Sequence, residues 1–292
     1  MKKAIALMMS AVMCAAVLTG CGSTPASGSS AAENDGQQST SSAQVSEPAK
    51  SGSAEAGSSD ASAADTGNGG VLRVGTNAEF PPFEYVGDDG EPDGFDIALI
   101  KAIGEKLGME VQVENMEFNS LVSAIGTKID VAIAGMTVDE ERKQSVDFSD
   151  SYYDAVQYVI VPAGSDIKTA ADLENKTIGT QLGTTGDFKV QDEIPGATSQ
   201  QYNKAVDAVN DLINGRVDAV IIDKNPALVF EKKFEGQVVA LDGADFDFEI
   251  ENYAIALPKG SDLLEKVNNA LAEIKADGTF DALVAEYIEG GE

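Results

Sequence analysis

The stretch from Ile129 to Tyr153, IDVAIAGMTVDEERKQSVDFSDSYY, constrains this chain more than any other. Its continuous apolar run at Val131–Ala134 predicts a short buried strand. Gly135 then allows the backbone to approach another group closely, because it has no side chain. Thr137 supplies a hydroxyl, and Arg142 supplies a guanidinium that can bind both oxygens of a carboxylate. The stretch therefore predicts a carboxylate-binding site.

The same residue types allow a second interpretation. A one-turn helix is expected after Thr137, with Asp139 and Glu140 suited to its positive first turn. Arg142 would then be a surface arginine paired with one of these acids, which is the commoner case for so short a motif. Residue types alone favour this interpretation, so the rest of the chain has to decide.

Expected strands and helices alternate along the chain, which predicts an α/β fold. The first unit has a strand at Leu72–Thr76, a loop at Asn77–Tyr85, a helix from Asp96 to Gly108 and a short helix at Phe118–Ile125. A strand at Gln157–Val161 precedes a second unit. The strands expected in that unit are Thr177–Thr180, Thr198–Tyr202, Val217–Ile222 and Val238–Leu241, with helices beginning near Thr184, Lys204 and Asp223.

The composition excludes several classes of function. Acidic residues number 49 against 20 basic ones, and the net charge of -29 argues against nucleic acid and anionic lipid as partners. The chain has no histidine, and its two cysteines, Cys14 and Cys21, lie in the first 21 residues. We therefore expect no disulfide, no catalysis by cysteine or histidine, no zinc or copper site and no cofactor in the folded part.

The sequence of the first 70 residues is typical of a secretory signal followed by a spacer. Lys2 and Lys3 precede an apolar run that ends in LTGC at Cys21, which resembles a bacterial lipoprotein cleavage site. Residues 1–20 are then the signal peptide and Cys21 carries the lipid; the alternative is an ordinary signal that contains a cysteine. Residues 21–70 are rich in Ser, Ala and Gly, and we expect a disordered tether spanning roughly 40 Å.

Several motifs of this chain occur in the same order, and at nearly the same spacing, as the motifs of a known family. They are GTNAEFPPFEY near Phe80, GFDIALIKAIGEKLG from Gly94, IDVAIAGMTVDEERK, VDFSDSYY, GTQLGTTGDF from Gly179, GRVDAVIID ending at Asp223 and YAIALPKGSD from Tyr253. From Val71 to about Ile288 the chain resembles the polar amino-acid family (family 3) of solute-binding proteins that serve ABC importers.

The resemblance implies a two-lobed, type II periplasmic-binding-protein-like fold. Two α/β lobes are joined by a hinge of two strands, with the ligand in the cleft between the lobes. Residues 71–153 would form the first part of lobe 1, residues 154–250 lobe 2, and residues 251–292 the return to lobe 1. The crossings would fall near Tyr152–Val156 and Glu249–Tyr253.

The resemblance also implies how the charges of an amino acid are bound. We expect Arg142 to bind the carboxylate with help from Thr137, the backbone of Gly135 and the helix opened by Thr184 and Thr185. Plain N-capping is the alternative for the two threonines, and a cap can also bind. Asp223 and the backbone of Ala134 would accept the ammonium, although Asp223 also suits a helix cap.

For the ligand side chain we expect contacts with Asn77, Phe80, Phe118 and Gln181. Phe80 and Phe118 match family positions that line the pocket, although a phenylalanine is more often core. Asn77 and Gln181 are uncharged, so we expect a polar neutral amino acid first, a basic one second and an acidic one last. A basic ligand would need a further acid, for which Glu79, Glu117 and Asp187 lie close in sequence.

These expectations describe a monomeric, lipid-anchored binding protein and not an enzyme. It would stand on the outer face of the bacterial cytoplasmic membrane, capture a free amino acid between closing lobes and deliver it to an ABC permease. The alternative is an enzyme on the same fold, similar to a prephenate or arogenate dehydratase, because an acid placed in such a cleft could catalyse that reaction.

The anchor can be tested by replacing Cys21. In a bacterial host that processes lipoproteins, Cys21→Ala should release the protein from the membrane or leave its signal uncleaved, because no thiol remains to carry lipid. Fractionation and the mass of the mature chain measure both effects. Membrane attachment at normal mature size would contradict the anchor.

Overall fold

The computed structural model describes residues 70–290. The expected signal peptide, Cys21 and all of the tether but Gly70 lie outside this range. Strands and helices alternate within it, as expected, and they build two main sheets and one small sheet. No helix among the described residues is both long and apolar enough to cross a membrane.

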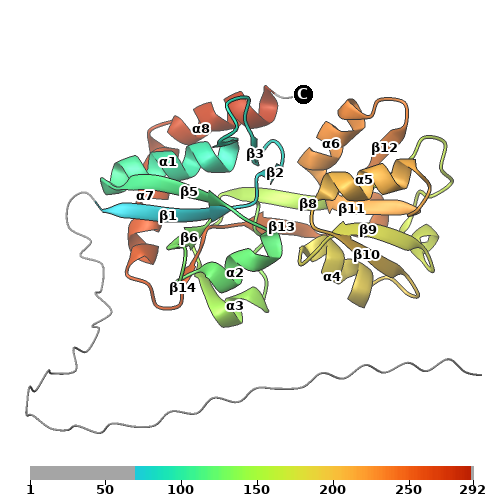
Figure 1. Cartoon of the computed structure of the whole chain (residues 1–292), viewed down its shortest axis with the longest axis horizontal. Coiled ribbons are helices and arrows are strands. Elements are labelled where there is room, and N and C mark those ends of the chain that lie inside the picture. The colour runs from blue at the N-terminus through green and yellow to red at the C-terminus, as the bar shows by residue number, and fades with distance from the viewer. Residues whose placement is uncertain (1–69, 291–292) are drawn as a thin grey trace, which may run out of the picture. The chain divides into compact units, whose positions relative to one another are not determined.

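The first sheet contains strands from both ends of the described chain. Its order is β5-β1-β6-β14-β7, and β1 is parallel to β5 and β6 whereas β14 is antiparallel to β6 and β7. Helix α1 packs against α7 and α8 beside this sheet (Figure 1). The bounds are β1 Val71–Thr76, β5 Glu110–Asn115, β6 Val131–Ala132, β7 Val146–Phe148, β14 Ala256–Pro258, α1 Phe95–Leu107, α2 Leu121–Ala124, α3 Arg142–Ser145, α7 Leu263–Ala276 and α8 Thr279–Leu283.

The second sheet follows the order β10-β9-β11-β8-β12. Strands β9, β10 and β11 are parallel, and β8 runs antiparallel between β11 and β12. The bounds are β8 Tyr153–Pro162, β9 Thr177–Gln181, β10 Thr198–Tyr202, β11 Ala219–Asp223, β12 Val238–Leu241, α4 Thr185–Asp192, α5 Ala205–Ile213 and α6 Lys224–Lys233.

Two antiparallel strands join the sheets. The first residues of β8 pair with β13 (Ile250–Tyr253), in the register Glu251 to Ala155 and Tyr253 to Tyr153, while its last residues belong to the second sheet. The chain then passes from β13 into β14 of the first sheet (Figure 1). Two sheets joined by two strands are the arrangement that the sequence predicts for an α/β chain of two lobes.

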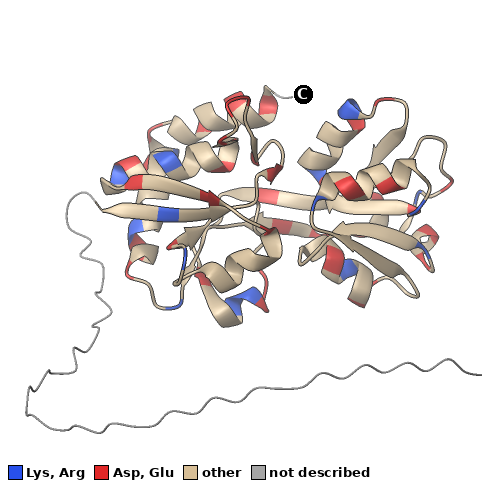
Figure 2. Ribbon diagram, in the orientation of Figure 1, with Lys and Arg blue, Asp and Glu red and all other residues tan. Residues whose placement is uncertain are grey.

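Apolar periodicity explains how the helices pack. In α1, Leu99, Ile100 and Ile103 are completely buried, and Gly108 ends the helix at φ 66°, in the left-handed region that favours glycine. Acidic residues are spread over the helices and loops around both sheets (Figure 2). Hydrophobic burial therefore builds each layer, and the negative charge stays largely at its surface.

Local structure differs from the expectation in two places that border the cleft. The expected loop at Asn77–Tyr85 contains β2 (Glu79–Phe80) and β3 (Glu84–Val86), which form a small sheet with β4 (Pro92–Asp93). Helix α3 begins only at Arg142, because Asp139 accepts a hydrogen bond from the Arg142 N–H at 2.8 Å and so precedes the helix.

Candidate functional site

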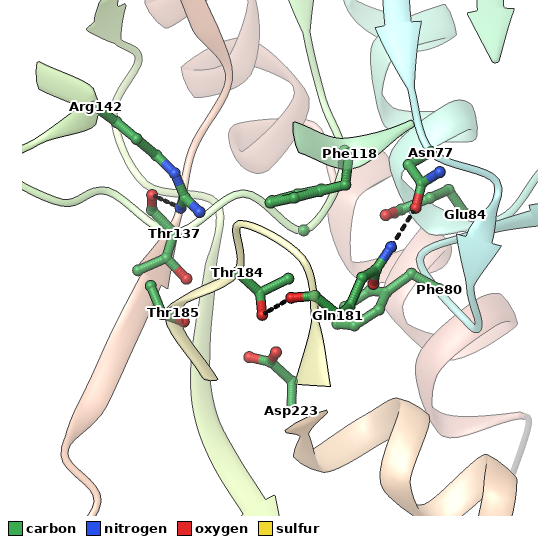
Figure 3. Close-up of a pocket in the computed structure, with 12 residues that line it drawn as sticks. Asn77, Phe80, Glu84, Phe118, Thr137, Arg142, Gln181, Thr184, Thr185 and Asp223 are labelled. Carbon is green, nitrogen blue, oxygen red and sulfur yellow. Dashed lines mark hydrogen bonds between the residues drawn. The ribbon is translucent and has the colours of Figure 1, made fainter. Parts of the chain in front are cut away.

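One cavity between the two main sheets brings together every residue that the sequence predicts to bind the ligand. The volume of the cavity is only about 20 Å³. Its walls therefore lie close together. The lining residues are Asn77, Phe80, Glu84, Phe118, Ala134, Gly135, Thr137, Arg142, Gln181, Thr184, Thr185 and Asp223 (Figure 3).

Arg142 is buried in this cavity and is not a surface arginine. Only 7% of it is exposed, and its guanidinium lies 5.4 Å from the centroid of the Phe118 ring. It donates hydrogen bonds to the carbonyl of Thr137 at 2.7 Å and to that of Gly183 at 2.9 Å, and it pairs with Asp139. These contacts hold a cation at the wall of the cavity.

Gly135 lies in the cavity wall, and its N–H already has a partner within the protein, the Asp96 carboxylate at 2.8 Å. The expected contact between the Gly135 backbone and a ligand carboxylate stays a prediction. The Gly135 backbone has φ 50°, and a Cβ here would lie 2.9 Å from the Phe80 ring. A side chain would therefore displace Phe80 from the cavity wall.

The start of α4 supplies backbone and hydroxyl groups from the second sheet. Thr184 is the N-cap, and its hydroxyl accepts from the Asp187 N–H at 3.3 Å, as the capping interpretation expects. The hydroxyl of Thr185 donates to Glu251 at 2.7 Å. The first N–H groups of a helix attract anions, so this end of α4 suits a carboxylate.

Asp223 ends β11 with its carboxylate directed toward the cavity (Figure 3). It occupies the N-cap position of α6, but its side chain makes no capping hydrogen bond, and its Oδ1 has no hydrogen-bond partner in the described part of the chain. Burial and the negative charge of Glu251 raise the pKa of Asp223 to about 7. A cationic group beside Asp223 would offset both the cost of burying its charge and the repulsion from Glu251.

Glu84 is the cavity residue that sequence reasoning missed. It is completely buried, and neither carboxyl oxygen has a hydrogen-bond partner among residues 70–290. Burial and the charge of Asp96 raise its pKa well above the usual range, which favours its protonated form. The segment FPPFEY resembles a loop, and its sequence alone does not show that the glutamate points inward.

The acids that the sequence offered for a basic ligand lie elsewhere. Glu79 pairs with Lys204 at 2.6 Å, and Asp187 accepts hydrogen bonds from the side chains of Ser199 and Gln201. Neither of these acids, nor Glu117, lines the cavity. Glu84 and Asp223 are therefore the acids of its wall.

Asn77 and Gln181 join the two sides of the cavity. Gln181 Nε2 donates to Asn77 Oδ1 at 2.8 Å and to the carbonyl of Asn203 at 3.1 Å (Figure 3). Asn77 Nδ2 donates to the carbonyl of Met116 at 2.9 Å. Much of the hydrogen-bonding capacity of these amides is thus used within the protein.

No group of three or more acidic, histidine or cysteine side chains in residues 70–290 could hold a metal ion.

The raised pKa of Asp223 predicts how stability depends on pH. Its usual value is 3.8 and its folded value about 7, so between these pH values the folded chain holds a proton that the unfolded chain has lost. The free energy of unfolding should therefore fall as pH rises through this window. Asp223→Asn should flatten the fall and raise the Tm at pH 8 in the absence of amino acid. The surface control Asp192→Asn should keep the wild-type slope, and identical slopes in all three proteins would contradict the assignment.

Known proteins resemble both the sequence and the fold. The chain is 36% identical over 225 residues to the arginine-binding extracellular protein ArtP of Bacillus subtilis, covering 75% of this chain and 86% of ArtP. It is 34% identical to the L-cystine-binding protein TcyJ of Escherichia coli, covering 75% and 82%. An ancestral arginine-binding protein bound to arginine matches with a TM-score of 0.70 and 42% identity, covering 75% and 98%, and it was also solved bound to glutamine.

One structural relative has a link to catalysis. The ancestral amino acid-binding protein AncCDT-1, a precursor of cyclohexadienyl dehydratase, matches with a TM-score of 0.68 and 35% identity, covering 75% of this chain and 95% of that one. The sequence profile of one family matches residues 72–290, which confirms the resemblance that the motifs indicated. The chain therefore belongs to the bacterial extracellular solute-binding proteins of family 3.

Proposed function

We propose that this protein captures a free L-amino acid in the cavity and delivers it to an ABC permease. The observation that carries the proposal is the pair of buried, opposite charges in one cavity, Arg142 and Asp223. An α-amino acid carries both complementary charges. The carboxylate would bind Arg142 and the N–H groups at the start of α4, and the ammonium would bind Asp223.

The narrow cavity supports a mechanism in which the two sheets separate. A cavity of only about 20 Å³ cannot take up an amino acid unless its walls move apart. Strands β8 and β13 join the sheets, so a bend there would move Arg142 relative to Asp223. Ligand contacts with both walls would then favour the closed form.

The side chain of the ligand should carry N–H donors. When ionised, the two oxygens of Glu84 can accept a guanidinium at both positions, and when protonated its carbonyl oxygen can accept from an amide. The sequence ranked a polar neutral ligand first because Asn77 and Gln181 are uncharged, but these amides bind each other. We therefore place a basic amino acid first, a polar neutral one second and an acidic one last.

The remaining parts of the proposal concern location and boundaries. A lipid on Cys21 would hold the monomeric protein at the outer face of the cytoplasmic membrane, with residues 21–70 as tether. The hinge would separate residues 71–153 and 251–292 from residues 154–250, since β8 and β13 lie at those limits.

An enzyme of the prephenate or arogenate dehydratase type is the second candidate. Glu84 favours it, because a buried carboxyl that stays protonated can act as a general acid. The relationship to AncCDT-1 adds support. Incubation with prephenate separates the two functions: formation of phenylpyruvate would favour the enzyme, and tight amino-acid binding without turnover would favour the transport protein.

A melting-temperature screen against the common L-amino acids tests the proposed function. At 100 times the Kd, a true ligand should add about 2.7 kcal/mol to the free energy of unfolding, which is a shift of several degrees. Arginine or lysine should give the largest shift, glutamine a smaller one, and aspartate or glutamate the smallest. A largest shift with glutamate would show that the charge argument is wrong, and no shift with any amino acid would refute the function.

Truncating either charge of the site should weaken binding strongly. Removing one partner of a desolvated charge pair typically costs ~2–5 kcal/mol, so Arg142→Ala and Asp223→Ala should each lower affinity by about 30-fold or more. Calorimetry with the best ligand of the screen measures the effect, and circular dichroism checks that the variants fold. Lys143→Ala is the matched control, because Lys143 is the exposed neighbour of Arg142 and pairs with Glu140. Near wild-type affinity in either cavity variant would remove that residue from the site.

A further inference from the structure

Glu251 contacts both walls of the cavity through a single oxygen. It lies on β13, opposite Ala155 of β8, and its side chain is 10% exposed. Its Oε2 accepts hydrogen bonds from the hydroxyl of Thr137 at 2.9 Å and from that of Thr185 at 2.7 Å. Thr137 belongs to the segment between β6 and α3, whereas Thr185 opens α4 beside the second sheet. The two walls therefore meet at one carboxylate of the hinge.

These two hydrogen bonds determine whether each threonine hydroxyl can still donate or can only accept. A hydroxyl has one proton to donate and two lone pairs to accept with. Because Thr137 and Thr185 donate their protons to Glu251, each hydroxyl oxygen can only accept, and that of Thr185 already accepts from Gln157 Nε2 at 3.2 Å, which leaves it one lone pair. The Thr137 hydroxyl, which sequence reasoning assigned to the ligand carboxylate, thus suits the ammonium instead.

The charges around Glu251 keep this carboxylate in place. Lys189 Nζ lies 3.7 Å from Oε1, and Gln157 Nε2 donates to Oε2 at 3.4 Å. Burial lowers the pKa of Arg142, and the nearby charge of Glu251 opposes this, whereas burial and the same charge both raise the pKa of Asp223. Among these groups Glu251 is the only one whose hydrogen bonds reach both threonines, so its loss would affect both walls at once.

We propose that Glu251 is a positioning residue of the hinge. Its carboxylate holds Thr137 and Thr185 together across the cavity, an interaction that we call the clasp, and it turns both hydroxyl oxygens toward the ammonium of the ligand. Separation of the walls must break at least one of the two hydrogen bonds. The clasp therefore favours the closed arrangement independently of any ligand. Only the affinity part of the test below depends on the proposed function.

The first test measures closure with no amino acid added. Spin labels at Ser123→Cys on α2 and Asp192→Cys on α4 report the separation of the walls, in the full chain with Cys14→Ser and Cys21→Ser. Ser123 and Asp192 are exposed, and α2 lies against the first sheet whereas α4 lies against the second (Figure 1). Glu251→Ala should shift the distance distribution to longer values. Glu251→Gln should stay near wild type, since its amide oxygen can still accept from both hydroxyls.

The matched control is Asn252→Ala, which removes a neighbouring side chain of β13 that pairs with Asp154 outside the cavity. It should leave the distances unchanged. Wild-type distances in Glu251→Ala, equal shifts in Glu251→Ala and Asn252→Ala, or equal shifts in Glu251→Ala and Glu251→Gln would each overturn the clasp. Failure of the wild type to bind any amino acid would refute the proposed function but would leave this comparison decisive.

The second test measures how the negative charge of Glu251 affects ligand binding by Asp223. Glu251→Gln removes the negative charge that raises the pKa of Asp223. Asp223 should then stay ionised to lower pH, so the loss of L-arginine affinity on acidification should move down by about one pH unit. The other charged groups near Asp223 and Glu251, namely Glu84, Arg142 and Lys189, are the same in both proteins. Calorimetric titration from pH 5 to 8 measures the profile, and an unmoved profile would overturn the placement of Glu251 beside the ammonium site.

Discussion

Charges buried in the cavity constrain the rest of the structure. Arg142 and Asp223 are only 7% and 8% exposed, and Glu84 is completely buried. A buried charge is strongly destabilising unless it is paired, hydrogen-bonded or neutralised. Arg142 is stabilised by backbone carbonyls, and Glu84 by holding a proton. Asp223 has an oxygen without a hydrogen-bond partner in the described chain, and its raised pKa favours the neutral form, so a proton or, on the proposed function, the ammonium of a ligand would stabilise it.

The hinge determines how this stabilisation can act over the whole molecule. Strands β8 and β13 are paired from Tyr153 to Val156 on one side and from Ile250 to Tyr253 on the other. Glu251 lies within that pairing, yet its side chain reaches Thr137 and Thr185. A small change of twist between the strands therefore changes contacts at the cavity directly. Binding energy gained in the cavity and the geometry of the hinge are coupled through one side chain.

The sequence predicted the layers and the membership of the cavity because both depend on local patterns. Apolar periods placed α1 and the buried strands, and motif positions placed Arg142 and Asp223 on facing walls. It did not show which partners come from distant segments. The N–H of Gly135 is taken by Asp96, and the amides of Asn77 and Gln181 bind each other. Such pairings depend on tertiary packing, which a single sequence does not display.

Glu84 connects these pairings to ligand choice. A protonated carboxyl can donate to an amide oxygen and accept from an amide N–H without a change of charge. A cationic side chain stabilises the ionised form instead, so its binding is linked to release of the proton from Glu84. This release opposes binding less as pH rises toward the pKa of Glu84, which burial and the charges of Asp96 and Asp223 hold high. On the proposed function, the preference for a basic over a neutral ligand should therefore increase with pH, under the control of acids that need not touch the ligand side chain.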